Sequence, residues 1–316
     1  MRLSWCKQIG ALSFCAGLGV LWGCESFNLN ISFVTPKTAE ATETQTAALP
    51  AGARVVVNND NGSTRITVDP AATQATIVID RIAKAQDQAA ADDLLTKVVV
   101  TVTQPSADNG NTLTISAPRP APASDDEGDF SFTLNDDELN ITGVMPSRQV
   151  AVVKLTITLP SGFSVDVTHK NGFIRGAGLD SAGTLTMEHG SVRVLDSTGA
   201  ITVRVTHGDV NVDDHQGSLD ARVEDGSLTI DVHSLVTGQQ IQGRTTDGHL
   251  ALGVLRDINA QLTASADHGM VNFFAGDFDL VNNLMQTRHS LTATLNGGGP
   301  TIDLQTEHGM VDIRGR

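Results

Sequence analysis

Glycines spaced nine residues apart constrain the fold of this chain more than any other feature. They stand at Gly190, Gly199, Gly208, Gly217 and Gly226. Apolar residues alternate with polar ones after each glycine, which indicates a strand with one buried face. A glycine at a fixed interval indicates a turn. The two kinds of turn differ, so the complete repeat is eighteen residues long, as at positions 172, 190, 208 and 226.

A repeat this short cannot bury its own apolar face and must stack on its neighbours. We therefore predict an all-β protein, a single-chain β-solenoid (β-helix) built of coils of about 18 residues. No proline occurs between Pro160 and Pro300, as expected where nearly every backbone N–H is needed in a strand ladder. The series loosens to Gly248 and Gly269, and Gly309 closes it.

The end of the chain is expected to form an open strand edge. The segment MVDIRGR ends three residues after Ile313, which predicts an uncovered terminal coil, with Asp312 and Arg314 discouraging unspecific pairing. We expect this C-terminal coil either to associate edge to edge with a second copy or to dock a partner.

The first 23 residues are typical of a secretory signal peptide. Arg2 and Lys7 precede a short apolar run over residues 9–21. The following LWGC stretch resembles the lipobox of bacterial lipoproteins, which implies lipid attachment at Cys24; the alternative is an ordinary signal peptide with a chance cysteine. Such a chain is exported and anchored to the cell envelope, and Glu25 after the cysteine favours the outer membrane.

The body of the chain has no cysteine, because all three cysteines fall within the first 24 residues. This excludes a disulfide framework, a thiolate zinc site and a cysteine nucleophile. The formal net charge of −15 repels phosphate backbones, so nucleic acid is a poor partner. Anionic lipid is disfavoured for the same reason, so membrane association has to come from the lipid anchor.

Composition divides the exported part. Residues 24–52 are rich in Thr, Ala and Glu and are predicted to be a lipidated N-terminus and flexible tether. Residues 53–316 are predicted to be the β-solenoid domain. One short helix is expected within residues 81–98, which are rich in alanine. Residues 118–147 carry prolines and acids and are predicted to be a mobile insertion.

The order of these segments resembles the DUF4097 family. The resemblance rests on NGSTRITV, a helix between strands, VKLTITLPSGFSVDVTHKNGFIRG and the repeated glycine–valine coils, and it covers roughly residues 52–316. It implies an exported or lipid-anchored bacterial β-solenoid that is adhesin-like. It implies no catalytic residues.

Histidine often precedes the repeated glycines. The column reads Asn171, His189, His207, Asp225, Asp247, His268 and His308. Asn, Asp and His are the residues that best tolerate the left-handed region, so a tight-turn role accounts for the whole column. The alternative is a metal-binding envelope protein, in which stacking would let His189, His207 and Asp225 hold Zn²⁺ or Cu²⁺, flanked by Glu188 and Glu224.

A carbohydrate-active β-helix enzyme of the lyase or glycosidase type is a further alternative. It needs paired carboxylates, and Asp213 with Asp214 or Asp277 with Asp279 could supply them. The body lacks Trp and Tyr for stacking on sugar rings, and it has no nucleophile elbow, zinc-binding helix motif or P-loop. The sequence therefore predicts no enzyme and no cofactor, but a binding or scaffolding module for an unknown protein or surface ligand, presented by mixed polar outward faces.

Overall fold

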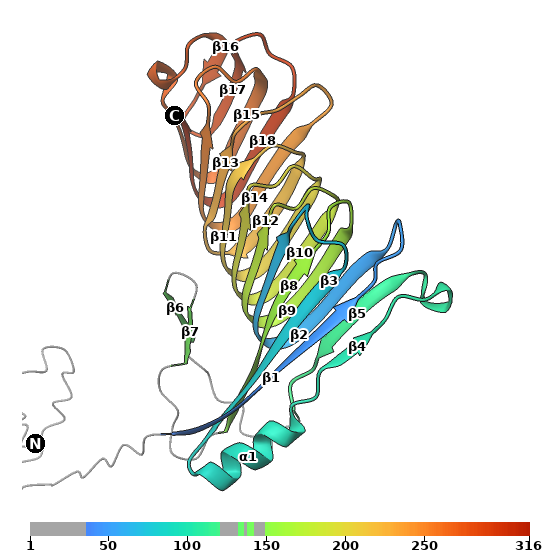
Figure 1. The fold of residues 1–316 in the computed structure, drawn as a ribbon. Helices are drawn as coiled ribbons and strands as arrows, with labels where there is room; N and C mark the ends of the chain where they lie inside the picture. The colour runs from blue at the N-terminus through green and yellow to red at the C-terminus, as the bar shows by residue number, and fades with distance from the viewer. Residues whose placement is uncertain (1–35, 121–131, 136–137, 142–148) are drawn as a thin grey trace, which may run out of the picture. The chain divides into compact units, whose positions relative to one another are not determined.

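The computed structural model describes residues 36–120, 132–135, 138–141 and 149–316, and nearly all of its regular structure is β-strand (Figure 1). The N-terminal strands are β1 (Lys37–Ala47), β2 (Arg54–Val68), β3 (Ala75–Ala85), β4 (Thr101–Thr103), β5 (Thr112–Ala117), β6 (Phe132–Asn135), β7 (Glu138–Ile141) and β8 (Val150–Leu159). The repeat region contains β9 (Ser164–Ala177), β10 (Gly183–Leu195), β11 (Ile201–His215), β12 (Leu219–Asp225), β13 (Leu228–Val232), β14 (Gln240–Val254), β15 (Ala260–Phe273), β16 (Val281–Gln286), β17 (Ser290–Leu295) and β18 (Thr301–Gly315). The helices are α1 (Gln88–Lys97) and the short 3-10 turns η1 (Ala107–Asn109) and η2 (Ala275–Asp277).

The eighteen-residue repeat is visible as strand register. β9, β10 and β11 pair in parallel, so that Gly172 lies beside Gly190 and Gly190 beside Gly208. At the next level Gly226 separates β12 from β13, which pair with the two halves of β11. Sixteen of the strands form one large mixed sheet. The prediction of a mostly β chain with one short helix is confirmed.

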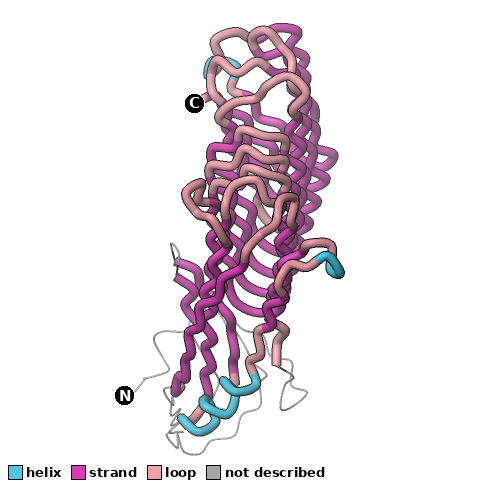
Figure 2. Tube along the Cα trace, turned by 45° about the vertical axis from the view of Figure 1, so that its right-hand side comes forward, coloured by secondary structure: helices cyan, strands magenta, loops and turns pink. Residues whose placement is uncertain are grey.

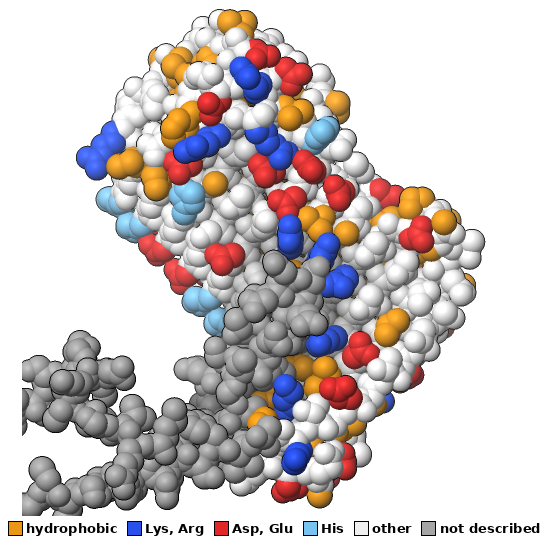
Figure 3. Space-filling view, turned by 60° about the vertical axis from the view of Figure 1, so that its left-hand side comes forward, with side chains coloured by type: hydrophobic (Ala, Val, Ile, Leu, Met, Phe, Trp, Pro, Cys, Tyr) orange, Lys and Arg blue, Asp and Glu red, His pale blue; other side chains and the backbone are white. Residues whose placement is uncertain are grey.

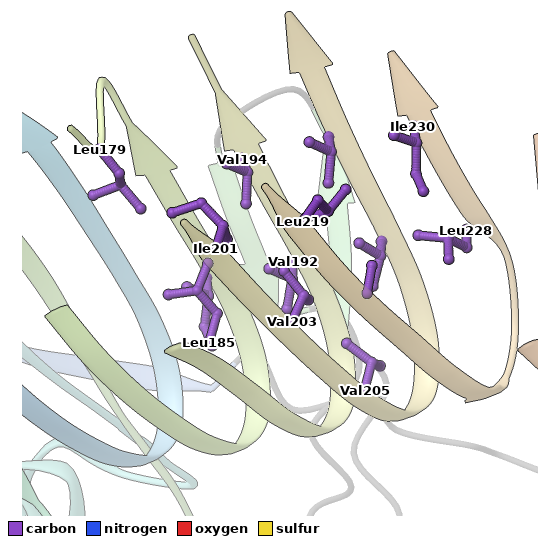
Figure 4. Packing of buried hydrophobic residues seen from close by; sticks show 14 of the residues in the cluster. Leu179, Leu185, Val192, Val194, Ile201, Val203, Val205, Leu219, Leu228 and Ile230 are labelled. Atoms are coloured by element: carbon purple, nitrogen blue, oxygen red, sulfur yellow. The ribbon is translucent and has the colours of Figure 1, made fainter. Parts of the chain in front are cut away.

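Inward side chains form continuous apolar rows across the parallel strands. Val203 of β11 lies in register between Leu185 of β10 and Ala221 of β12, and all three are fully buried. Figure 4 shows Leu185, Val203 and neighbouring apolar side chains lying on the inner side of the wound strands. One cluster of buried residues extends in this way from Ala47 to Ile313. The connecting loops lie one above another along the strand stack (Figure 2).

The helix is shorter than its sequence pattern. Residues 81–85 of the expected helix continue β3, because Ile82 and Ala83 pair with β8. The helix begins after Asp87, whose carboxylate accepts a hydrogen bond from the backbone N–H of Ala90 at 2.8 Å. An N-cap of this kind satisfies one of the donors that the first turn leaves unpaired.

The tether prediction is wrong for residues 37–47. These residues form β1, which pairs along its whole length with β3 in the antiparallel direction. Ala39 and Ala47 are buried and the side chains between them are mostly exposed. The Thr-rich composition that suggested a flexible tether therefore belongs to an edge strand, since threonine fits a half-buried pleated surface well.

The predicted order of the last coils is also wrong. β18 lies between β14 and β15, in parallel register with both. The MVDIRGR segment is consequently covered on both sides, with Val311 and Ile313 fully buried. The C-terminal strand therefore offers no open edge for the expected self-association. The strand order ends instead at β16, beyond the antiparallel β17.

Within the predicted insertion at residues 118–147, the structure describes the antiparallel hairpin β6–β7 as a separate two-stranded sheet. The predicted signal peptide, Cys24 and most of the insertion lie outside the described residues. Across the described part of the chain, none of the helices has the length and hydropathy needed to cross a membrane.

Candidate functional site: an arginine row beside a histidine–aspartate ladder

The repeated glycines bend strands rather than end them. Gly190 and Gly208 lie inside β10 and β11, each with φ +138°. A Cβ on Gly208 would overlap the carbonyl oxygen of Gly190 on the neighbouring strand. Both the positive φ and the close approach of two backbones require glycine. The glycine column therefore forms a bend at which successive strands lie in direct backbone contact.

The turn role assigned to the histidines is wrong. Among the described residues, positive φ outside glycine occurs at five positions, and none of them precedes a column glycine. His189 and His207 are ordinary strand residues, since glycine alone supplies the unusual dihedral angle. Their side chains stand half exposed along the outside of the bend. A left-handed preference therefore does not explain why histidine and aspartate occur there.

In space the column reads Asn171, His189, His207, Asp225, Asp247, His308 and His268, because β18 precedes β15 in the strand order. The two outer histidine pairs stack, with ring centroids 4.8 Å apart for His189–His207 and 5.0 Å apart for His268–His308. Each inner histidine contacts an aspartate: His207 Nε2 lies 3.2 Å from Asp225 Oδ2, and His308 Nδ1 lies 3.3 Å from Asp247 Oδ1. Figure 3 shows histidines on either side of acidic side chains along this margin. We call the six residues after Asn171 the bend ladder.

The bend ladder is not a preformed metal centre. Nowhere in the described part of the chain do three His, Cys, Asp or Glu side chains converge on a point that a metal ion could occupy. His189 Nε2 lies 3.8 Å from Glu188 Oε1, and the His189 ring stacks on that of His207. A tetrahedral zinc site needs three or four ligands at about 2.0–2.3 Å, so the trio of the metal-binding alternative, His189, His207 and Asp225, would have to rearrange to form one.

Beside the ladder lies a groove of about 510 Å³ that runs across the strands. It is lined in part by Arg204, Arg222 and Arg244, which occupy the same register position on β11, β12 and β14. Successive strands in such a ladder lie about 4.8 Å apart. The repeat thus places three guanidinium groups in a row, which we call the arginine row.

Acidic side chains flank the arginine row on one side. Asp220 accepts hydrogen bonds from Arg204 at 3.0 Å and from Arg222 at 3.2 Å, and Asp303 lies 3.6 Å from Arg244. Although burial alone would raise it, the pKa of Asp220 is lowered overall by the hydrogen bonds and charges of these two arginines. Each arginine of the row therefore has an acidic partner.

Acids also line the groove on the side of the bend ladder. Glu224, Asp267 and Glu307 stand there. Together with Asp220 and Asp303, they place five carboxylates around the three arginines, so the groove is strongly polar with a small excess of negative charge. Such a surface suits a polar ligand better than a highly charged one.

Three of the four carboxylates considered for the alternative enzyme contact separate arginines. Asp213 accepts hydrogen bonds from Arg193 at 3.0 and 3.1 Å, whereas Asp214 bonds to Arg316 at 2.7 Å. Asp279 lies 3.6 Å from Arg256. None of these carboxylates lines the groove. Cys24 and the acids of residues 125–129 lie outside the described residues.

The sequence contained part of the signal for the groove. The outward positions of Arg204, Asp220 and Arg222 follow from the two-residue alternation, but Arg244 joins them only because four extra residues between β13 and β14 are accommodated without a change of register. The pairing of His308 with Asp247 and with His268 could not be predicted, because β18 precedes β15 in the strand order. Its signal was the shared DHG or EHG sequence at 267–269 and 307–309.

Fold and surface together define a β protein in which parallel strands repeat every eighteen residues and carry aligned polar rows. A family model described as Toastrack DUF4097 matches residues 95–314. The chain belongs to this family. No curated protein matches it.

Two solved structures of bacterial proteins show weak similarity to this chain. One is called a "putative cell adhesion protein" from Clostridium sporogenes, with 10% identity, a TM-score of 0.35, and coverage of 89% of this chain and 100% of that one. Another is called a "putative adhesin" from Bacteroides fragilis, with 12% identity, a TM-score of 0.29, and coverage of 86% and 97%.

Proposed function

We propose that this chain is a non-catalytic, adhesin-like lipoprotein of the cell envelope, with its parallel strands wound as a β-solenoid that serves as a binding or scaffolding module. The groove with the arginine row carries the proposal. It presents the same kind of polar group on successive strands, so it suits an elongated ligand that crosses several strands. The LWGC stretch supplies the anchoring half, through lipid attachment at Cys24.

Rigidity supports a binding role. The guanidinium groups of the arginine row are held by Asp220 and Asp303, and the strands that carry them are paired on both sides. A ligand would therefore meet groups already fixed in place, which lowers the entropic cost of binding. Catalysis is less well supported, because three of the four carboxylates considered for sugar cleavage contact separate arginines.

Lipid attachment is tested by growing cells that express the full chain with labelled palmitate. We expect label on the wild-type protein and its recovery with membranes, and loss of both in Cys24→Ser. The matched control is Cys15→Ser, which lies within the leader and should keep label and membrane association. Labelled Cys24→Ser protein, or an unlabelled wild type, would contradict the proposed anchor.

Ligand binding is tested by affinity capture from intact envelopes with the full chain as bait. We expect a ligand that is retained by the wild type and at least about tenfold depleted with Arg222→Ala, a loss of about 1.4 kcal/mol in binding. Arg193→Ala is the matched control, because Arg193 also pairs with an aspartate but lies outside the groove. Equal capture by the two variants would exclude the groove as the binding face.

A further inference from the structure

Exposed apolar side chains concentrate at one end of the strand order. Seven large hydrophobic residues are exposed among those described, and five of them fall within residues 270–285: Met270, Phe274, Leu280, Leu284 and Met285. Met285 is 70% exposed and Leu280 53%. Figure 3 shows apolar side chains gathered at the upper end of the molecule, where Figure 1 places β16 and β17. An apolar concentration of this kind marks an interaction surface more often than chance.

The same end carries an unpaired strand edge. β16 pairs with β17 on one side and terminates the strand order on the other. All of its side chains except Val281 are exposed. Outside the bulge at Asn283 and Leu284, its free backbone N–H and C=O groups can bond a further strand. The partner that fits this edge therefore offers both a strand and apolar side chains.

The surroundings of β16 are ordered rather than loose. Phe278, which precedes the strand, is buried and stacks on Phe273 with ring centroids 5.3 Å apart. The Arg314 guanidinium lies 4.2 Å from the centre of the Phe274 ring. The exposed side chains thus stand on a packed base. Ordering cost on binding is correspondingly small.

From this combination we infer that β16 is a self-association edge, which binds β16 of a second copy of the chain as an antiparallel strand. We call Leu280 and β16 together the β16 edge. The inference is independent of the groove and of any ligand that the groove binds.

Charge selects a second copy as the occupant. Residues 280–286 contain no charged side chain, so a two-fold pairing of β16 with itself brings no like charges together. The opposite end of the strand order differs: β1 exposes Lys37, Glu40 and Glu43. Charges on an edge strand are a common protection against pairing. The chain protects one edge and leaves the other uncharged, despite a net charge of −15 that discourages contact elsewhere.

The first test measures the mass of the detergent-solubilised full chain by sedimentation across a range of concentrations. We expect a concentration-dependent dimer, with a dissociation constant raised at least about tenfold in Leu284→Lys. Val236→Lys is the matched control, because Val236 is 61% exposed but lies in the loop between β13 and β14. A wild type that stays monomeric throughout, or equal effects of the two variants, would overturn the inference.

The second test separates self-association from binding of another protein. Leu284→Lys and Leu284→Glu should each be mainly monomeric, and an equal mixture should recover dimer, since opposite charges then meet. In cells, Leu284→Cys should form a disulfide-linked dimer and Val236→Cys should not; no native cysteine follows Cys24. Failure of the mixture to associate, or cross-linking of Leu284→Cys to a different protein, would contradict pairing between copies. Unchanged thermal melting of each variant excludes unfolding as the cause.

Discussion

Glycine 208 illustrates how strongly one residue can be required. Its φ of +138° and its contact with the backbone of Gly190 both exclude a side chain. We expect Gly208→Ala to lower the free energy of unfolding by at least about 3 kcal/mol. Two controls separate the causes: Gly238 has φ +92° with open space around it, and Gly276 has open space with no positive φ. The melting temperature should be near the wild-type value for Gly276→Ala, intermediate for Gly238→Ala and lowest for Gly208→Ala. Equal melting temperatures for Gly208→Ala and Gly238→Ala would contradict the backbone contact.

A buried histidine makes stability depend on pH. His169 is 1% exposed, and its Nε2 lies 2.7 Å from the Thr64 hydroxyl. Burial lowers the pKa of His169 to about 3, whereas an unfolded chain has an ordinary value near 6.5. Between these values the unfolded state binds the extra proton, so stability is present above about pH 6.5 and is lost as the pH falls towards 3. Burial also lowers the pKa of His215.

The pH effect is measured by urea unfolding at pH 7, 5 and 4. We expect His169→Met with Thr64→Val, which removes the ionisable group and its hydrogen-bond partner together, to flatten the loss of stability on acidification. Each unit of pKa difference corresponds to about 1.4 kcal/mol. His289→Gln, at an exposed position, should leave the pH dependence unchanged. A double variant with the wild-type dependence would show that His169 is not responsible.

Among the strands, the repeat predicted register well and spatial order less well. Alternation and glycine spacing were sufficient to expect that Gly172, Gly190 and Gly208 align, as they do. They could not reveal that β18 inserts between β14 and β15, because each of these strands presents the same glycine and the same apolar alternation to a neighbour. Local pattern determines which residues face inward, whereas the choice of neighbour depends on the antiparallel β17, which covers one side of β15.

The candidate site was predictable to the same extent. The outward residues of single strands could be read from alternation, but the arginine row and the bend ladder each combine residues from strands whose neighbours were unknown. The histidine column was recognised and its cause was misassigned. A glycine that alone carries the positive φ leaves the residue before it free to be chosen for contacts across strands, such as His207 with Asp225.

The internal position of β18 can be tested by truncation. Ending the chain after Gly309 removes Val311 and Ile313 from the core and unpairs parts of both β14 and β15. Burial of two such side chains contributes about 3–6 kcal/mol, so we expect a large fall in melting temperature. Deletion of residues 37–47, an edge strand with two buried alanines, should cost less. The opposite ranking would place β18 at an edge.

One continuous core makes the described chain a single cooperative unit. The buried cluster extends from Ala47 to Ile313, and residues 35–316 form one compact unit. We therefore expect one unfolding transition, although repeat proteins that interact only through neighbours can unfold in steps.

Both tryptophans lie at positions 5 and 22, so Phe173→Trp and Phe278→Trp supply local probes near opposite ends of the repeat region. In a chain from which the leader has been removed, the two probes should report the same urea midpoint, and Gly208→Ala between them should lower both midpoints equally; midpoints that separate would show that the two ends unfold independently.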